Sequence, residues 1–266
     1  MKNKRKYMLA VASASTALLL QACGGGGGGG GGGSADAVSA DATPDSMPGV
    51  TTGTVSAPFE PSDIARYLLV GPDRLSSGRR LQTYEQIDGA VVSMNDNVLS
   101  GNDRMVGSVA GDASFALGIW RTGAVSYDKG ADILTGNDGR EYHYILYNGL
   151  QSLPMSGNFE CDTGTFTTPI RISGTGPLRG RATGNARLSF DANGANVDAS
   201  VTVSASEEGR RTFSTTGMSA SDITFNAGQG NVALGNAGNG AYAVVGLYQV
   251  AAGGSVYRGT YRFLCK

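Results

Sequence analysis

Strand patterns with one apolar and one polar face occupy much of the second half of the chain. In 195–204, alternate positions carry Val or Ala. In 256–265 most of the aromatic side chains share one face, and Arg258, Thr260 and Arg262 share the other. Because successive strand residues point to opposite faces, these patterns predict an antiparallel sheet with one face in water. The strands predicted in this way are 114–121, 142–147, 195–204, 240–249 and 256–265.

One pattern is typical of a helix, and it spans residues 61–75. Residues 61–63, Pro-Ser-Asp, offer an N-cap, and Ile64, Leu68 and Leu69 share one face at helical spacing. A Gly-Pro pair then ends the pattern. We therefore expect one helix at the start of the folded region, before the strands.

Glycine positions indicate a turn-rich β domain. Three Asn-Gly pairs offer the positive φ angles that tight hairpins need. These pairs are Asn148-Gly149, Asn193-Gly194 and Asn239-Gly240. Gly246 and Gly259 lie inside strand patterns, where an isolated glycine often marks a bulge or a barrel corner. At about 15 residues per strand and turn, residues 142–265 hold about eight strands. The expected fold is therefore mainly β, with an antiparallel eight-stranded β-barrel at the C-terminus whose interior side chains fill.

The first residues have the pattern of a secretory signal. Basic residues crowd the first six positions, and an apolar run of about 13 residues follows at 8–20. This run is shorter than the roughly 20 residues of a spanning helix. Residues 20–23, Leu-Gln-Ala-Cys, resemble the lipobox of bacterial lipoproteins, which implies cleavage before Cys23 and acylation of this residue. The alternative is an ordinary signal peptide with a chance cysteine at the cut.

The net charge of the chain becomes more negative once this signal is removed. The whole chain has 21 Lys+Arg against 22 Asp+Glu, a net charge of −1. Without residues 1–22 it has 17 basic and 22 acidic residues, a net charge of −5. A nucleic-acid binder would carry a basic excess, so no nucleic-acid partner is expected. The expected partner is a membrane, to which acyl chains on Cys23 would anchor the protein. Gly24 after Cys23 favours the bacterial outer membrane, by analogy with lipoprotein sorting.

A low-complexity segment separates this cysteine from the folded region. Residues 24–33 are ten consecutive glycines, and 34–57 contain no aromatic residue, Leu or Ile. Such a stretch cannot bury enough apolar area to offset its ordering entropy. We expect a disordered tether with a root-mean-square span of about 30–35 Å. The predicted order is a signal peptide at 1–22, acylated cysteine and tether at 23–57, a small β-rich N-terminal region at 58–141 and the β-barrel at 142–266.

Several short segments resemble the transferrin-binding protein B-like surface lipoproteins. They are Gly118–Gly123 with Trp120, His143-Tyr144, Gly149, Leu153–Gly157, Phe159, Gly246–Tyr248 and Arg258–Phe263. In that family, similar segments form a Trp-bearing strand, the entry to a β-barrel and its closing strand pair. The factor H-binding surface lipoproteins are similar and also carry a Gly-rich tether. Ile119 and 159–161 depart from the family pattern, which bears on the ligand more than on the fold.

The resemblance implies a handle-like N-terminal region and a surface-exposed binding module. Its ligand would be a host serum protein, an outer-membrane receptor or an iron source such as transferrin, haemoglobin or haem. The alternative is a structural or accessory envelope lipoprotein that faces the periplasm without a host ligand. No ligand-binding residue follows from the sequence under either interpretation.

Cys161 and Cys265 are the thiols that remain besides the acylated cysteine. The signal places them outside the cytoplasm, where disulfides persist. The first strands of a closed barrel neighbour the last, so we predict a disulfide between these residues. In the chain-entropy model, closing a loop of about 100 residues stabilises the fold by roughly 4–5 kcal/mol. A redox pair or metal site is the alternative, but the spacing fits no known motif.

The sequence offers no catalytic motif. It contains neither a Gly-x-Ser-x-Gly elbow nor a His-Glu-x-x-His zinc motif, so we expect a protein that is not an enzyme, with no metal and no catalytic residue. His143, the one histidine, is expected to be packed in the sheet or at its rim. The alternative is a haem or metal ligand, with Tyr142, Tyr144 or Tyr147 as companions.

Two segments repeat one pattern, at Leu99–Asp103 and Leu134–Asp138. They resemble half of a calcium-binding nonapeptide repeat, but two isolated copies cannot stack, so we interpret them as hairpin turns. Arg210 and Arg211 form the most cationic spot among the long loops that a partner could reach. These predicted loops are 71–80, 205–212 and 227–240.

Overall fold

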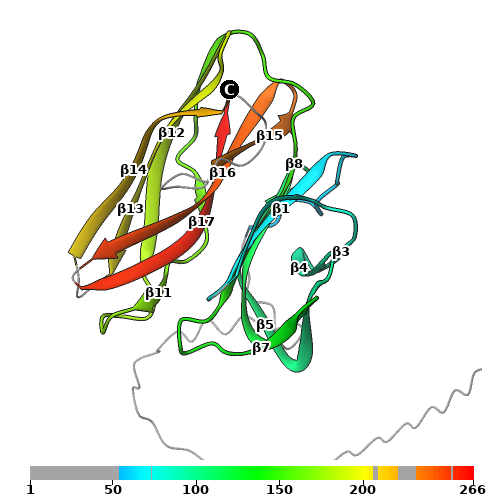
Figure 1. Cartoon of the computed structure of the whole chain (residues 1–266), viewed down its shortest axis with the longest axis vertical. Coiled ribbons are helices and arrows are strands. Elements are labelled where there is room, and N and C mark those ends of the chain that lie inside the picture. The colour runs from blue at the N-terminus through cyan, green and yellow to red at the C-terminus, as the bar shows by residue number, and fades with distance from the viewer. Residues whose placement is uncertain (1–53, 73, 206–208, 221–231, 253) are drawn as a thin grey trace, which may run out of the picture. The chain divides into compact units, whose positions relative to one another are not determined.

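The computed structural model describes the chain from residue 54 onward. It covers residues 54–72, 74–205, 209–220, 232–252 and 254–266, with 77 and 209–220 described by their backbone alone. These residues belong to one compact unit, Pro44–Lys266, and they form strands, turns and loops (Figure 1). They include no helix with the length and hydropathy to cross a membrane. The predicted signal, Cys23 and all but the end of the predicted tether lie outside the described residues.

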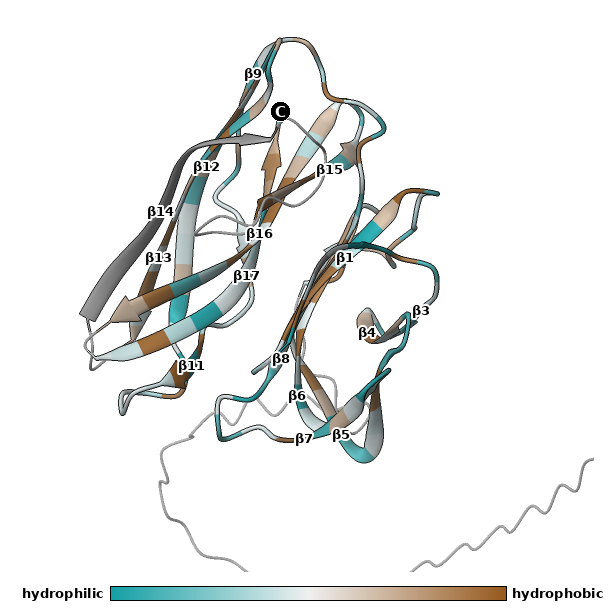
Figure 2. Ribbon diagram, viewed as in Figure 1, coloured by the Kyte–Doolittle hydropathy of each residue, from teal (hydrophilic) through white to brown (hydrophobic). Residues whose placement is uncertain are grey.

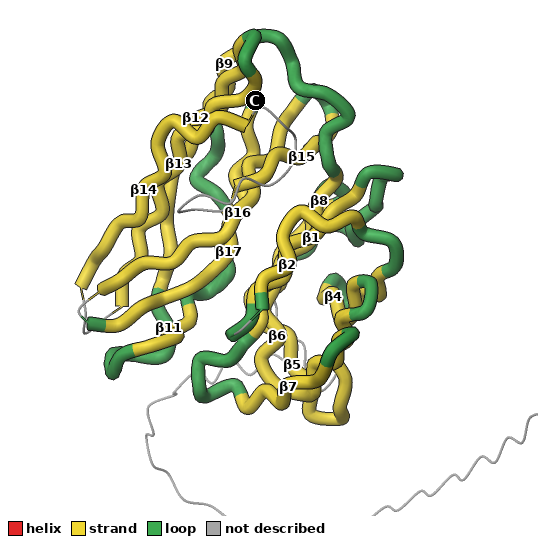
Figure 3. Tube along the Cα trace, viewed as in Figure 1, coloured by secondary structure: helices red, strands yellow, loops and turns green. Residues whose placement is uncertain are grey.

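The first eight strands form one antiparallel sheet, here called the N-terminal sheet. Its strand order is β2-β1-β8-β6-β5-β4-β3, with β7 beside β6 (Figure 3). The strands are β1 Ala65–Val70, β2 Leu75–Arg80, β3 Tyr84–Ile87, β4 Ala90–Met94, β5 Asn97–Asp112, β6 Phe115–Tyr127, β7 Gly130–Thr135 and β8 Tyr142–Asn148.

The remaining strands form two antiparallel sheets, here called the C-terminal sheets. One has the order β10-β17-β16-β15 with β11 beside β17, and the other has the order β14-β13-β12-β9. The strands are β9 Gly157–Glu160, β10 Thr165–Phe166, β11 Ile170–Ser173, β12 Arg181–Asp191, β13 Gly194–Ala205, β14 Gly209–Ala220, β15 Val232–Gly238, β16 Ala241–Ala252 and β17 Ser255–Cys265. Apolar side chains of both sheets meet in one core. Figure 2 colours these strands, apart from β14, by the hydropathy of each residue, with hydrophobic residues in brown. The protein is therefore mainly β, as predicted.

The two C-terminal sheets join at one edge, where β9 meets the end of β17. Cys161 and Cys265 are bonded there with an S–S distance of 2.02 Å, as the sequence argument expected. The Lys266 N–H donates to the carbonyl of Glu160 at 3.0 Å, which continues the pairing. The result is a curled antiparallel half-barrel in the order β14-β13-β12-β9-β17-β16-β15. Within the described residues no pairing closes β14 onto β15, so the eight-stranded barrel is not confirmed.

The predicted helix at 61–75 is wrong, because its centre is strand β1. Tyr67 and Leu69 face the core inside the N-terminal sheet, and Leu68 and Val70 face a second core on the other side. A strand buried on both faces has a continuous apolar run, and periodicity alone cannot distinguish such a run from a buried helix. The N-cap residues instead belong to an irregular segment before the strand.

The prediction of one wet face also fails, for the central strands β6, β8 and β17. The second core packs β1, β6 and β8 of the N-terminal sheet against β15 and β16. In β17 the face predicted to be wet is buried, with Arg258 2%, Thr260 0% and Arg262 5% exposed. Strand β13 does follow the prediction, since its Val and Ala positions are buried and Asp198 is exposed.

The boundary predicted at residue 142 does not separate the sheets. Strand β8 starts at Tyr142 but lies inside the N-terminal sheet, between β1 and β6. The change to the C-terminal sheets falls after Asn148, in the loop that leads to β9. Because the cores of the two regions share β8 and its neighbours, the described residues do not divide at 142.

The N-terminal sheet curls until β4 faces strands that are not its neighbours. The Trp120 Nε1–H donates to the carbonyl of Val91 at 2.7 Å, and the Val91 N–H donates to the Tyr144 hydroxyl at 3.1 Å. Trp120 and Tyr144 lie on β6 and β8, and β5 separates β6 from β4 in the sheet order. These hydrogen bonds therefore cross the concave face, where both aromatic side chains are buried.

The predicted turns have mixed outcomes. Asn193-Gly194 joins β12 to β13, and Asn239-Gly240 joins β15 to β16 with φ of 51° and 74°, so both hairpins are confirmed. Asn148-Gly149 ends β8 without a hairpin, because both residues are held by a separate segment. Leu99–Asp103 lies within β5 at a register shift, so the predicted hairpin there is wrong. Leu134–Asp138 runs from the end of β7 into a bend, but β7 does not pair with β8, so this segment forms no hairpin either.

Glycines inside strands lie opposite tyrosine rings. Gly118 pairs with Tyr144 and Gly259 with Tyr248 across neighbouring strands. A Cβ atom at either glycine would overlap the hydroxyl of the opposing tyrosine. The glycine at 259 therefore makes room for an aromatic ring, which the prediction of a bulge or corner did not anticipate.

Candidate binding cleft

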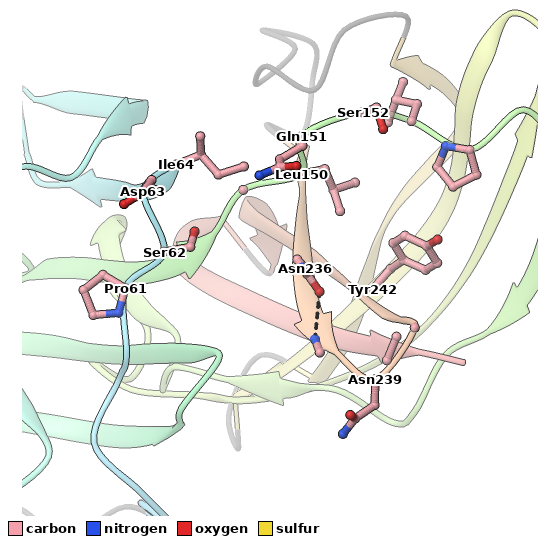
Figure 4. Close-up of a pocket in the computed structure, with 16 residues that line it drawn as sticks. Pro61, Ser62, Asp63, Ile64, Leu150, Gln151, Ser152, Asn236, Asn239 and Tyr242 are labelled. Atoms are coloured by element: carbon pink, nitrogen blue, oxygen red, sulfur yellow. Dashed lines mark hydrogen bonds between the residues drawn. The ribbon is translucent and has the colours of Figure 1, made fainter.

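Loops from the N-terminal and C-terminal sheets converge on one open cleft of about 770 Å³. Three segments line it, and Figure 4 shows their side chains. They are 61–64 before β1, 149–154 after β8, and Asn236 with 238–242 at the β15–β16 hairpin. A volume between about 300 and 1,000 Å³ is typical of ligand pockets.

The Asn148 side chain fixes the first wall. Its Oδ1 accepts the Ser62 N–H at 2.6 Å, and its Nδ2 donates to the carbonyl of Glu60 at 3.0 Å. The Gly149 N–H donates to the carbonyl of Ile64 at 3.3 Å, and a Cβ on Gly149 would lie 2.7 Å from that oxygen. A glycine is therefore required where the chain passes this closely.

The hairpin Asn239-Gly240 forms the second wall. Both residues have positive φ, as a tight two-residue turn requires. The Gly238 N–H donates to Oδ1 of Asn236 at 2.9 Å, which closes the base of the turn. Asn236 and Asn239 are exposed, so their amide groups border the opening.

Tyr242 is the aromatic residue of the lining and comes from the start of β16. Its ring centroid lies 4.8 Å from that of Phe159 and 5.0 Å from that of Phe190. Aromatic pairs at such distances stabilise beyond the area that they bury. The half-buried Tyr242 ring is therefore held in place from the side of the half-barrel core.

Charge is sparse around the cleft. Among the described residues that line it, Asp63 is the one with a charged side chain. Two guanidinium groups near the first wall donate to main-chain carbonyls. Arg80 binds the carbonyl of Asp63 at 2.9 Å, and Arg66 binds that of Gly78 at 2.6 Å. The cleft is thus lined by amides, hydroxyls and one carboxylate.

A second cluster of polar side chains, here called the polar seam, is buried between the N-terminal sheet and β17. Arg258 donates to the carbonyls of Gly71 at 2.6 Å and Glu141 at 3.0 Å, so one guanidinium joins β17 to the end of β1 and the start of β8, which lie side by side. The Glu141 carboxylate is fully buried, and Arg179 lies 3.4 Å from its Oε1. These contacts position strands, because all of them lie inside the fold.

Arg262 completes the seam at its other end. Its guanidinium lies 4.4 Å from the centroid of the Phe115 ring and is flanked by Asp112 at 4.0 Å and Asp162 at 3.7 Å. Burial lowers the pKa of Arg262 from its ordinary value, and the two carboxylates oppose this shift. The residue remains a cation, because arginine pKa values lie far above neutrality.

His143 lies in the seam and is fully buried, which agrees with the expected packed position. Its Nδ1 is 2.9 Å from Oγ1 of Thr167, and its Nε2 has no hydrogen-bond partner among the described residues. Burial, followed by the charge of Arg258, lowers the pKa of His143 well below its usual value. The neutral imidazole is therefore the form that the fold accommodates.

The tyrosines named as companions of His143 do not surround it as a ligand set. Tyr142 and Tyr144 face the core inside the N-terminal sheet, and Tyr147 faces the second core. Tyr142 donates to the carboxylate of Asp132. In the described part of the chain, no group of three His, Cys, Asp or Glu side chains is arranged to hold a metal ion.

The three loops predicted as places of partner contact are only partly loops among the described residues. Much of 71–80 is strand β2, and 232–238 is strand β15. The side chains of Arg210 and Arg211, the segment 206–208 and residues 227–231 lie outside the described residues. Sequence reasoning missed the cleft, although two of its three Asn-Gly pairs, at 148 and 239, lie on it. The sequence signal for the cleft was these two Asn-Gly pairs, which were interpreted as turns alone and not as segments that could lie close together in the fold.

The fold and the cleft define a mainly β protein with an open cleft, lined by amides, hydroxyls and one carboxylate, where loops of the N-terminal and C-terminal sheets meet. Comparison with protein-family models, with curated proteins and with solved structures found no match for this chain.

Proposed function

We propose that this chain is a lipid-anchored binding module displayed on the surface of a bacterial outer membrane. The observation that carries the proposal is the cleft, because loops from the N-terminal and C-terminal sheets converge on it. The walls are held by side-chain hydrogen bonds and a tight hairpin, so the site is formed before a ligand arrives. Preorganisation of this kind favours binding, since little ordering entropy remains to be lost.

The sequence supports the anchored part of this proposal. The lipobox-like segment at 20–23 supplies an acylation site, and the Gly-rich stretch up to residue 57 supplies reach. The resemblance to transferrin-binding protein B-like lipoproteins favours a host serum protein or an iron source as the partner. It also favours a closed barrel of eight strands in place of the half-barrel.

Protease shaving of intact cells tests this function. We expect a protease that cuts within 24–57 to release the folded region from intact Gram-negative cells, because a surface-displayed tether would be accessible to it. A Cys23→Ser variant should appear in the soluble fraction, since it lacks the acylated residue. Protection in intact cells, with cleavage only after the outer membrane is permeabilised, would contradict surface display. That result would support the periplasmic accessory role instead.

A further inference from the structure

We propose that the cleft binds a neutral oligosaccharide, an inference that rests on the proposed binding function. The described residues that line the cleft include no cation, and their one charged side chain is the exposed carboxylate of Asp63. Phosphate, sulfate and carboxylate ligands are recognised through arginine and lysine. The guanidinium groups of Arg66 and Arg80 donate to main-chain carbonyls and are not among the lining residues. An anionic ligand would therefore meet the Asp63 carboxylate with no cation among the described lining residues.

The polar groups at the opening match a ligand rich in hydroxyls. Gln151, Asn236 and Asn239 carry amides, and Ser62, Ser152 and Tyr242 carry hydroxyls. Each of these groups both donates and accepts hydrogen bonds. Every sugar hydroxyl does the same, so a saccharide replaces the water at these exposed groups without leaving charges or donors unpaired.

Two apolar side chains of the lining contribute little surface to the cleft. Leu150 is 7% exposed and Ala241 6%, so little of their apolar surface is offered to an acyl chain or a large apolar side chain. Tyr242 and Pro154 present apolar surface at the side. Such surface suits the C–H faces of a sugar ring. The volume of about 770 Å³ holds a few rings, and the open form of the site allows a longer chain to continue beyond it.

The same chemistry occurs in two sources, a glycan on a host glycoprotein and a bacterial polysaccharide. The first test uses the full lipidated chain in detergent on an array of neutral tetrasaccharides built from glucose, galactose and N-acetylglucosamine. Each neutral compound is paired with its singly sialylated counterpart. We expect binding to neutral members and weaker binding to the sialylated ones. An array without any neutral binder would overturn the proposal, as would a preference for extended peptides added to the same array.

Variants locate the binding in the cleft. Asn239→Gly keeps the positive φ of the turn but removes the amide, and we expect two- to about tenfold weaker affinity for the best tetrasaccharide. Asn137→Gly is the matched control, because Asn137 is an exposed turn residue before β8, at the opposite end of that strand from Asn148. Asp63→Asn should bring the sialylated compound closer in affinity to the neutral one. Equal effects of both glycine substitutions would overturn the assignment to the cleft.

The two sources and the two proposals are separated by capture experiments. Capture of a serum glycoprotein that is lost after enzymatic deglycosylation identifies the host source, and binding to purified bacterial polysaccharide identifies the other. Capture that is unchanged by deglycosylation and by competing tetrasaccharide contradicts the saccharide inference but leaves the surface binding function intact. Protection from protease shaving, together with tetrasaccharide binding in vitro, contradicts surface display but not the chemistry of the cleft.

Discussion

Different contacts stabilise the curvature of the N-terminal sheet and that of the C-terminal sheets. In the N-terminal sheet, Trp120 and Tyr144 reach across the concave face and bind the backbone of Val91 on β4. The C-terminal sheets instead share a core of aliphatic and aromatic side chains, and the Cys161–Cys265 disulfide joins them along one edge. The comparison shows that a curled sheet is held either by long polar aromatics across the middle or by a covalent link at the edge.

Removing the disulfide is the strongest way to test whether the two regions depend on each other. A Cys161→Ala and Cys265→Ala double variant should lose about 4–5 kcal/mol, because a loop with a sequence separation of 104 opens in the unfolded state. Trp120, the one tryptophan, reports on the N-terminal sheet by fluorescence during urea unfolding, and circular dichroism reports on all strands. We expect both transitions to shift together, because the two regions share the core between β8 and β16. A shift in circular dichroism alone would mean that the regions unfold separately.

Arg258→Met tests the polar seam as the second link between the regions. The substitution leaves the buried carbonyls of Gly71 and Glu141 without this donor, and we expect a loss of about 3 kcal/mol in the free energy of unfolding. The Trp120 and circular dichroism transitions should then move apart. Arg187→Met is the control, because the Arg187–Glu160 pair is exposed and should contribute little. Equal losses in the two variants would refute a special role for the seam.

The glycine–tyrosine pairs allow a matched test in both regions. Gly118→Ala and Gly259→Ala each place a Cβ against a tyrosine hydroxyl, so we expect both to cost about 1–3 kcal/mol. Gly130→Ala is the control, because its Cβ would meet the Tyr127 ring at an ordinary 3.4 Å. Thermal unfolding measures all three. If Gly118→Ala or Gly259→Ala loses no more stability than Gly130→Ala, the glycine–tyrosine pair in that region does not stabilise the fold as the other pair does.

The smallest expected effect concerns pH. His143 stays neutral in the fold, whereas in the unfolded chain it takes up a proton below about pH 6.5. Stability is therefore fully present above that pH and falls as the pH drops, by up to about 1.4 kcal/mol per pH unit. His143→Gln should remove this part of the pH dependence. Urea unfolding from pH 7.5 to 5.5 would show parallel curves if His143 made no contribution.

Sequence patterns predicted the strands well where one face is wet or where the run is long. Val197, Val201 and Val203 alternate as expected in β13, and the cysteine pair follows from compartment and strand order. The prediction failed for β1 and for the polar face of β17, because both are covered by the other region. Arg258 and Arg262 are buried because they bind partners distant in sequence. A local pattern of apolar and polar positions carries no information about such partners.

The cleft could not be predicted from the sequence either, because it also depends on contacts between residues distant along the chain. Its segments lie at 61–64, 149–154 and 236–242, and no motif links them along the chain. The side chain of Asn148 joins the first two by accepting the Ser62 N–H and donating to the Glu60 carbonyl. Only the fold brings that amide to the segment before β1.

The position of this wall has a mechanical consequence. The described chain enters beside Gly111, where the N–H of Ser56 and the carbonyl of Thr54 pair with its backbone, and reaches Pro61 a few residues later. If the chain is anchored through Cys23 as proposed, a pull on a ligand in the cleft passes to the anchor through this short segment. Load on the wall at 61–64 reaches the anchor without crossing the half-barrel, so shear at this wall would be resisted first by the hydrogen bonds at Gly111 and Asn148.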